Sequence, residues 1–265
     1  MKIAVCIKSV PDSDYYDRIV IDPVTKVLVR KGIPTIINAA DRHAIEQAVQ
    51  IKEAAGGEIT IISMGPPAAR MQMLEALAMG GDRAVLVSDR KVGGSDTLAT
   101  SYILAKAVEK TGPYDLILTG NESADGATAH MPSQLGEWLG YSHAANVTAI
   151  ETEKDAVIVT RRLDGGLAKY RLKTPAVAAV SQRINEVRFL SATGILNAKK
   201  KSFEILSAAD LGDIDERYVG LAGSPSQNGE LHTIETGKNC IMIKGNEQEA
   251  AREVYSIIAP RLGLV

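Results

Sequence analysis

Residues 119–138, TGNESADGATAHMPSQLGEW, bring hydroxyl, carboxylate and imidazole side chains close together. Ser123, Asp125 and His130 are the residue types that a hydrolase uses as nucleophile, orienting acid and base. Such triads usually assemble from distant segments, and the chain has no GxSxG motif to hold an exposed nucleophile. These three residues therefore fit a hydrolase site poorly.

The same loop has the composition of a nucleotide-binding loop. It shares with residues 93–101, GGSDTLATS, a pattern of glycines, hydroxyls and a predicted helix start. Glycine lets the backbone approach a ligand, and the free N–H groups of a helix start suit an anion. An adenine nucleotide or a flavin diphosphate would use both loops, although neither GxGxxG after the first strand nor GxxxxGK[ST] occurs. Taken singly, each loop residue also fits a cap or a turn.

The elements that position these loops alternate between β-branched runs and helical patterns. Strands are predicted at residues 2–8, 58–64, 83–89 and 114–120. A helix capped by Asp41 continues to about residue 55, a second covers residues 67–79, and a third starts at residue 95 or 96. This alternation predicts a doubly wound sheet, in which ligands bind beyond the carboxyl ends of the strands.

The pattern changes after about residue 143. Alternating runs around the DGG at residues 164–166 predict a hairpin, so antiparallel strands should complete the sheet. We predict an α/β fold with a doubly wound, mainly parallel Rossmann-like sheet of the adenine nucleotide-binding type over residues 1–183. Residues 184–265 show no clear period before a last helix near 247–259, and predict an extended C-terminal arm. The arm could pack on another subunit or fold back on its own domain.

Composition limits the other functions. The 265 residues carry 30 basic and 32 acidic side chains, so no general charge attracts nucleic acid or an anionic membrane. No apolar run reaches the ~18 residues that a spanning helix requires. The two cysteines lack metal or disulfide spacing, and His43 and His130 have no partner at metal-ligand spacing. We expect a cytoplasmic protein without a metal site or membrane insertion.

Several motifs follow one another in the order found in one family. Together they resemble the β subunit of electron transfer flavoprotein over roughly residues 1–210. The segments that carry the resemblance are MKIAVCIKSVPD, INAADRHAIEQAVQIKE, ISMGPPAAR, EALAMGGDRAVLVSD, DLILTGNESADGATAHMPSQLGEWL, RRLDGGLAKYRLKTPAVAAV, RINEVRF and NAKKK.

The resemblance implies a partner α subunit that carries FAD and is wrapped by the C-terminal arm. The β subunit of this family holds AMP in the ordinary branch and a second FAD in the electron-bifurcating branch. In the latter, NADH donates a hydride, one electron goes to ferredoxin or flavodoxin, and the other reaches an acyl-CoA or hydroxyacid dehydrogenase through the α-subunit FAD. Oxidoreductase activity with NADH would then belong to the αβ complex, and no side chain need be catalytic. The alternatives are an ordinary β subunit with structural AMP, and a stand-alone nucleotide-binding protein.

The resemblance also implies the residues of a nucleotide site. Met64 stands where the ordinary branch tends to have cysteine, and residues 125–128 are closer to the bifurcating branch, which favours FAD. Thr97 and Thr100 would approach the isoalloxazine and ribityl part of the flavin. Ala192 falls where relatives place a leucine that docks dehydrogenases. The predicted cofactor-binding residues are Cys6, Asn38, Asp41, Met64, Asp96, Thr97, Thr100, Gly120, Asp125, Gly126, Ala127, Thr128 and Met131.

Overall fold

The structure, a computed structural model, describes residues 1–21, 28–29, 32–226, 229 and 240–264. The chain divides into two compact units, Met1–Gly229 and Glu230–Val265. The division therefore falls later than the predicted boundary between residues 183 and 184. The reason is that β13 (Ser202–Leu206) pairs in parallel with β7 (Arg83–Val87) and completes the sheet of the first unit.

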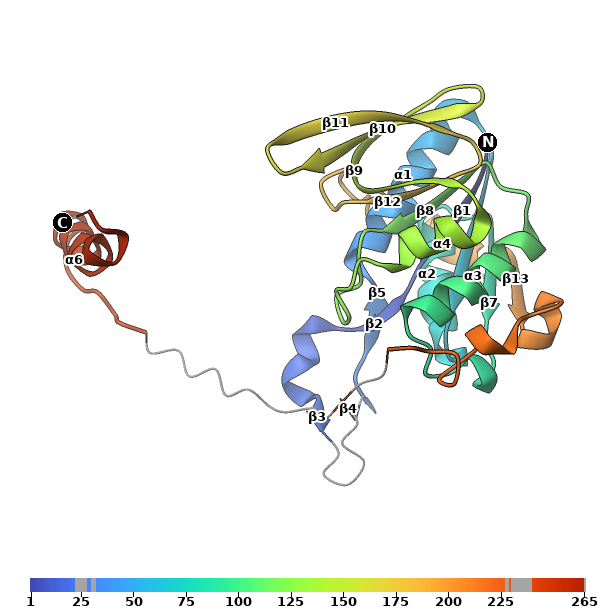
Figure 1. The fold of residues 1–265 in the computed structure, drawn as a ribbon, viewed down its shortest axis with the longest axis horizontal. Helices are drawn as coiled ribbons and strands as arrows, with labels where there is room; N and C mark the ends of the chain where they lie inside the picture. The colour runs from blue at the N-terminus through green and yellow to red at the C-terminus, as the bar shows by residue number, and fades with distance from the viewer. Residues whose placement is uncertain (22–27, 30–31, 227–228, 230–239, 265) are drawn as a thin grey trace. The chain divides into compact units, whose positions relative to one another are not determined.

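A nine-stranded, mainly parallel sheet forms the centre of the first unit (Figure 1). Among the described strands of this sheet, only β10 opposes the common direction: it pairs antiparallel with β9 and with β11, and the DGG hairpin predicted the second of these pairings. The predicted fold class is thereby confirmed. In sheet order the strands are β11 (Gly166–Lys173), β10 (Ala156–Leu163), β9 (Ser142–Thr152), β12 (Ala176–Val180), β8 (Leu116–Gly120), β1 (Lys2–Cys6), β6 (Glu58–Met64), β7 and β13.

Helices cover both faces of this sheet (Figure 1). In β1, Ile3 and Val5 join the core under one helical layer, whereas Ala4 and Cys6 join the core under the other. Because both faces are buried there, the central parallel strands β1, β8 and β12 are nearly continuous apolar runs rather than alternating. The first layer contains α1 (Ala39–Ala55), α2 (Arg70–Met79) and α5 (Ala192–Ala198), and the second contains α3 (Thr97–Thr111) and α4 (Met131–Leu139).

Short elements complete the first unit. They are the strand pairs β2 (Ser9–Pro11) with β5 (Thr35–Ile37) and β3 (Val20–Ile21) with β4 (Leu28–Val29), and the 3-10 turns η1 (Ser13–Arg18), η2 (Pro67–Ala69), η3 (Arg90–Val92), η4 (Ala208–Leu211) and η5 (Glu216–Tyr218).

The strand order reverses between β1 and β8. From β1 the chain adds β6 and then β7 on one side, and it returns through α3 to place β8 on the other side of β1. Such a reversal leaves a crevice at the carboxyl ends of the two strands, where ligands of open α/β sheets bind.

The predicted cap of the first helix is wrong. Asn38, not Asp41, occupies the N-cap position of α1, and Asp41 lies in the first turn. The Asp41 carboxylate does not cap its own helix because it accepts hydrogen bonds from distant backbone groups. α4 begins at Met131, because Ala127 and Ala129 just before it have positive φ angles of 46° and 54° that a helix does not accommodate.

Residues 184–191, which show no period in the sequence, are attached to α1 by polar contacts. Arg188 Nε lies 2.7 Å from Glu46 Oε2, and Arg188 Nη1 lies 2.7 Å from Glu53 Oε1. Burial raises the pKa of Glu46, but hydrogen bonds from Arg188 and Gln50 outweigh it, so the pKa lies below its ordinary value. Only 4% of the Glu46 side chain is exposed, so its charge depends on Arg188.

We predict that Arg188→Met costs about 2–4 kcal/mol of stability at pH 7, because Glu46 would remain buried without its counter-ion. Urea unfolding measures the loss. The matched control is Glu53→Gln, which removes the exposed carboxylate from the same guanidinium and should cost less than about 1 kcal/mol. Equal losses in the two variants would show that Glu46 does not need the pair.

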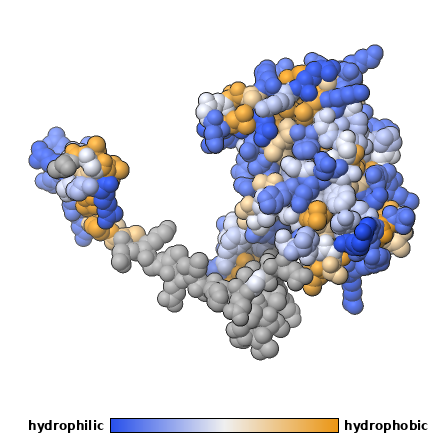
Figure 2. Space-filling model, in the orientation of Figure 1, coloured by the Kyte–Doolittle hydropathy of each residue, from blue (hydrophilic) through white to orange (hydrophobic). Residues whose placement is uncertain are grey.

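The second unit contains α6 (Glu247–Ile258) followed by the 3-10 turn η6 (Ala259–Leu262), which confirms the predicted last helix. Asn246 accepts hydrogen bonds from the N–H groups of Gln248 and Glu249 and so caps α6. Apolar side chains gather along this segment and are exposed (Figure 2): Val254, Tyr255, Ile258 and Leu262. In the described parts of both units, no helix is long and apolar enough to cross a membrane.

Candidate functional site

A cavity of about 430 Å³ lies at the reversal point, beyond the carboxyl ends of β1 and β8. Its volume is within the range of about 300–1,000 Å³ that small-molecule sites occupy. The N-terminal turns of α1, α3 and α4 also border it, and their free N–H groups favour an anionic ligand. The lining residues are Cys6, Ile7, Lys8, Asn38, Asp41, Met64, Ser95, Asp96, Thr97, Thr100, Leu104, Gly120, Asn121, Glu122, Ser123, Gly126, Thr128, Ala129, Met131 and Pro132.

Asp41 joins the elements that meet beneath this cavity. Its Oδ2 accepts a hydrogen bond from the backbone N–H of Lys8 at 2.7 Å, and its Oδ1 accepts one from the N–H of Gly120 at 3.0 Å. Burial raises the pKa of Asp41 to about 7, although these N–H donors and the Asn38 amide favour the ionised form. The carboxyl thus holds the ends of β1 and β8 to the first turn of α1.

Asn38 fixes the loop that follows β8. Its Nδ2 donates to Asp41 Oδ1 at 3.0 Å and to the carbonyl of Glu122 at 2.9 Å, while its Oδ1 accepts from the N–H of Ala124 at 3.0 Å. Asn38 is 2% exposed, so this bonding is internal to the fold. The loop is therefore tied to α1 through its backbone.

The side chains of Ser123 and Asp125 in this loop are both bonded to Lys8. Lys8 Nζ lies 2.6 Å from Asp125 Oδ1 and 3.3 Å from Ser123 Oγ. Lys8 is the one lysine or arginine that borders the cavity among the described residues. Ser123 Oγ accepts a hydrogen bond from Lys8, and among the described residues no hydrogen bond joins Ser123 to His130, as a Ser-His-Asp arrangement would require.

The start of α3 forms a second polar wall. Asp96 Oδ1 accepts a hydrogen bond from the N–H of Ala99 at 3.0 Å and so caps the helix. Thr97 and Thr100, on the first turn of α3, border the cavity. This confirms the predicted helix start at Asp96 and places the GGSDTLATS loop on the same cavity as the loop after β8.

The remaining wall is apolar and consists of Cys6, Met64, Leu104 and Met131. Burial, with a further contribution from the charge of Asp41, raises the pKa of Cys6 to about 12. Its thiol is therefore protonated at neutral pH and serves as a small apolar surface rather than as a nucleophile. The cavity thus combines an apolar wall with polar loops and helix N-termini.

Nearly all the predicted site residues meet at this cavity. The exceptions are Asp125 and Ala127, which belong to the loop after β8 without lining the cavity. Asp125 acts on it indirectly, by holding Lys8. Lys8 was not among the predicted site residues, although a lysine at the end of an apolar strand indicates this edge of a sheet. The other polar lining residues belong to the two loops that the sequence assigned to this edge but were not singled out individually as cofactor-binding residues: Ser95, Asn121, Glu122 and Ser123.

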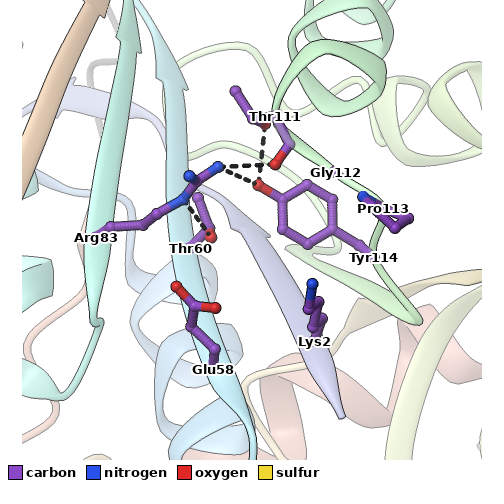
Figure 3. Close-up of a pocket in the computed structure, with 8 residues that line it drawn as sticks. All are labelled: Lys2, Glu58, Thr60, Arg83, Thr111, Gly112, Pro113 and Tyr114. Carbon is purple, nitrogen blue, oxygen red and sulfur yellow. Dashed lines mark hydrogen bonds between the residues drawn. The ribbon is translucent and has the colours of Figure 1, made fainter.

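A smaller cavity of about 190 Å³ lies at the amino ends of β1, β6 and β7 (Figure 3). Arg83 donates from Nε to Thr60 Oγ1 at 3.0 Å and from Nη2 to the carbonyl of Thr111 at 2.8 Å. Thr111 is the last residue of α3, so the guanidinium stabilises the C-terminus of that helix. We assign these residues a role in the fold. Within the described ranges, no group of three or more His, Cys, Asp or Glu residues could hold a metal ion.

Comparison with known proteins gives one consistent family. The profile of the electron transfer flavoprotein domain matches residues 25–211. The chain is 41% identical over 262 residues to "Electron transfer flavoprotein subunit beta" of Thermoanaerobacterium thermosaccharolyticum, covering 98% of this chain and 99% of that protein. It is 39% identical to "Protein FixA" of Azorhizobium caulinodans, covering 85% and 82%. It is 37% identical to "Caffeyl-CoA reductase-Etf complex subunit CarD" of Acetobacterium woodii, covering 86% of each chain.

Proposed function

The chain belongs to the electron transfer flavoprotein family, as a β subunit, and we propose that its cavity binds a second FAD besides the one on the α subunit. The observation that carries this proposal is that Thr97 and Thr100 border the same cavity as Gly120 and Thr128. One extended ligand can therefore contact both hydroxyl-rich loops. Family membership removes the hydrolase and stand-alone alternatives.

The residues present fit a flavin dinucleotide. Gly120 and Gly126 would let the backbone approach the diphosphate, near the N-termini of α1 and α4. The apolar wall defined above, to which Cys6 and Met64 belong, would face the isoalloxazine ring. We propose that the thirteen residues predicted from the sequence hold the cofactor, with Asp125 and Ala127 acting through the shape of their loop.

Bound FAD would supply the redox chemistry: it would accept hydride from NADH and deliver one electron to ferredoxin or flavodoxin and the other, through the α-subunit FAD, to an acyl-CoA or hydroxyacid dehydrogenase. The residues of this chain bind and orient the cofactor. The protonated Cys6 thiol adds no charge beside it, and Lys8 offers a cation to the diphosphate. We place this activity in the cytoplasm.

Two exposed apolar surfaces support the proposed partners. The face of α6 that contains Tyr255 and Ile258 is exposed and would pack on the α subunit. Around Ala192, where relatives place the docking leucine, Phe189 is 98% exposed and Leu196 is 68% exposed. We propose that the dehydrogenase docks on this surface of α5, with Leu196 supplying the apolar contact one turn after Ala192.

The decisive test is the nucleotide content of the purified αβ complex. The proposal expects two FAD and no AMP per dimer, quantified after denaturation by absorbance and chromatography. One FAD with one AMP per dimer would overturn it and favour an ordinary β subunit in which AMP only fills the cavity.

Thr97→Val combined with Thr100→Val should lower FAD affinity about 10- to 100-fold, because two hydroxyl contacts worth roughly 1 kcal/mol each are lost. Equilibrium titration of FAD into the nucleotide-free complex measures the change. Thr152→Val, at an exposed position of β9, is the control and should leave affinity unchanged. A double variant that retains its nucleotide at full occupancy would indicate a ligand that does not reach α3.

A further inference from the structure

The chain passes over the start of α3 shortly before it leaves the first unit. In this passage, residues 215–226, the backbone approaches the loop that precedes α3 very closely. A Cβ atom on Gly220 would lie 2.2 Å from the carbonyl oxygen of Lys91, and one on Gly94 would lie 3.2 Å from Leu221 Cβ. Two segments distant in sequence are thus in direct backbone contact, and this contact includes the glycines of the GGSDTLATS loop.

Asp96 connects this passage to the cavity. Its N–H donates to Ser224 Oγ at 2.8 Å, and its Oδ2 accepts from the N–H of Ser226 at 2.9 Å. Its Oδ1 caps α3 through Ala99, and the residue itself borders the cavity. One aspartate therefore bonds simultaneously to the α3 helix and to residues 224–226, at the wall of the site.

Ser224 is built into the fold rather than lying on its surface. It is 4% exposed, and its hydroxyl donates to the carbonyl of Gly220 at 2.7 Å while accepting from Asp96. The Ser224 hydroxyl thus donates its proton to a carbonyl within residues 215–226, and its oxygen accepts a hydrogen bond from Asp96 at the cavity wall. Alanine at this position would leave the N–H of Asp96 without its acceptor in a part-buried position.

Aromatic packing holds the other end of the passage against α3 and α4. The N–H of Asp215 donates to Tyr102 Oη at 2.6 Å. The Tyr218 ring lies 5.5 Å from the Tyr102 ring and 5.0 Å from the Trp138 ring, measured between centroids. Because this end is held independently of Ser224, loss of the hydroxyl should loosen the cavity wall while the passage remains docked.

We propose that Ser224 is a positioning residue of the nucleotide cavity: through Asp96 it sets the place of residues 94–97 and hence of the Thr97 hydroxyl. The inference rests on the proposed function, since it concerns the same site, but it adds a residue that does not line the cavity. The coupling free energy between ligand binding and the docking of residues 215–226 is reciprocal. If the docked segment strengthens ligand binding at this wall, the bound ligand must therefore stabilise the docked segment by the same free energy.

The test uses the full-length chain in the αβ complex, stripped of nucleotide and titrated with FAD and, separately, with AMP. Ser224→Ala should weaken binding of FAD about tenfold, because one hydrogen bond to the wall is lost. Titration well below the unfolding temperature keeps both proteins folded. In the unchanged protein, FAD should slow hydrogen exchange at the N–H groups of Asp96 and Ser226, a readout that does not require the variant to fold.

Ser207→Ala is the matched control. The Ser207 hydroxyl donates to Asp210 in an exposed capping box of η4, so its loss should lower stability without changing FAD affinity. Two outcomes would overturn this inference while leaving the proposed function intact. One is a Ser224→Ala variant whose FAD affinity is within twofold of that of the unchanged protein. The other is a rate of hydrogen exchange at residues 215–226 that does not change when FAD binds. Binding of AMP but not of FAD by the unchanged complex would overturn the proposed function, and failure to bind either nucleotide would overturn this inference as well.

Discussion

Replacing Gly120 with alanine is expected to cost about 3 kcal/mol of stability and to abolish nucleotide binding. A Cβ atom at this position would lie 2.3 Å from Asp41 Oδ1 and 2.7 Å from Ala40 Cβ. Both neighbours belong to the first turn of α1, so relief requires β8 and α1 to separate. That movement would break the bond between the Gly120 N–H and Asp41 and would open the floor of the cavity. Urea unfolding and the nucleotide content of the purified αβ complex measure the two losses.

Gly126→Ala is the matched control, since Gly126 also lines the cavity. Its Cβ would meet only Ser123 Oγ, at an ordinary contact distance of 3.4 Å. We expect a stability loss below about 1 kcal/mol for this variant. Full nucleotide occupancy in Gly120→Ala would show that α1 can shift away from β8 without damage to the site.

The sheet could be predicted because its signals are local. Each parallel strand is an apolar run bounded by turn residues, and each intervening helix repeats apolar residues at helical spacing. The ligand edge then follows from topology, since the carboxyl ends of parallel strands lie together. This is why two loops of unremarkable residues could be assigned to one cavity before their contacts were known.

Elements that depend on distant partners could not be predicted. β13 is short, follows a run of lysines and becomes a strand because β7 offers its free edge. The segment around Arg188 has no regular structure, and its place is fixed by carboxylates of α1 more than a hundred residues earlier. In neither case does the local pattern contain the interaction that decides the structure, so tertiary context overrides it.

In the site too, the residues with a local signal could be predicted, whereas the long-range contacts could not. Residue types and the family resemblance indicated most of the lining residues, including Thr97 and Thr100, which are far from β8 in sequence. They did not indicate that Lys8 and Asp125 form an ion pair, nor that Asp41 bonds to two strand ends. Asp41 was predicted as a cap because helix starts favour aspartate. Long-range N–H donors are the stronger partners of this carboxyl here, since without it they would be buried without an acceptor.

Asp41→Asn should therefore cost about 2–3 kcal/mol at pH 5, because both oxygens of the protonated carboxyl can still accept a hydrogen bond, whereas the NH2 group of asparagine cannot and would face the N–H of Lys8 or Gly120. The cost should shrink as the pH rises. Burial raises the pKa of Asp41 to about 7 in the folded chain, whereas an unfolded aspartate titrates near about 3.9. Between these values the folded chain holds a proton that the unfolded chain has lost, so stability falls with rising pH in the unchanged protein.

Asparagine has no proton to lose, so the stability gap between the two proteins should narrow by about 2–3 kcal/mol from pH 5 to pH 8. Urea unfolding of both proteins at the two pH values measures it. Asp115→Asn is the control: its carboxylate also accepts a backbone N–H, from Lys2 at 2.7 Å, but at an exposed position, so its gap should stay small. A gap for Asp41→Asn that widens with pH would mean that the N–H donors outweigh burial and keep the carboxylate ionised beneath the cavity.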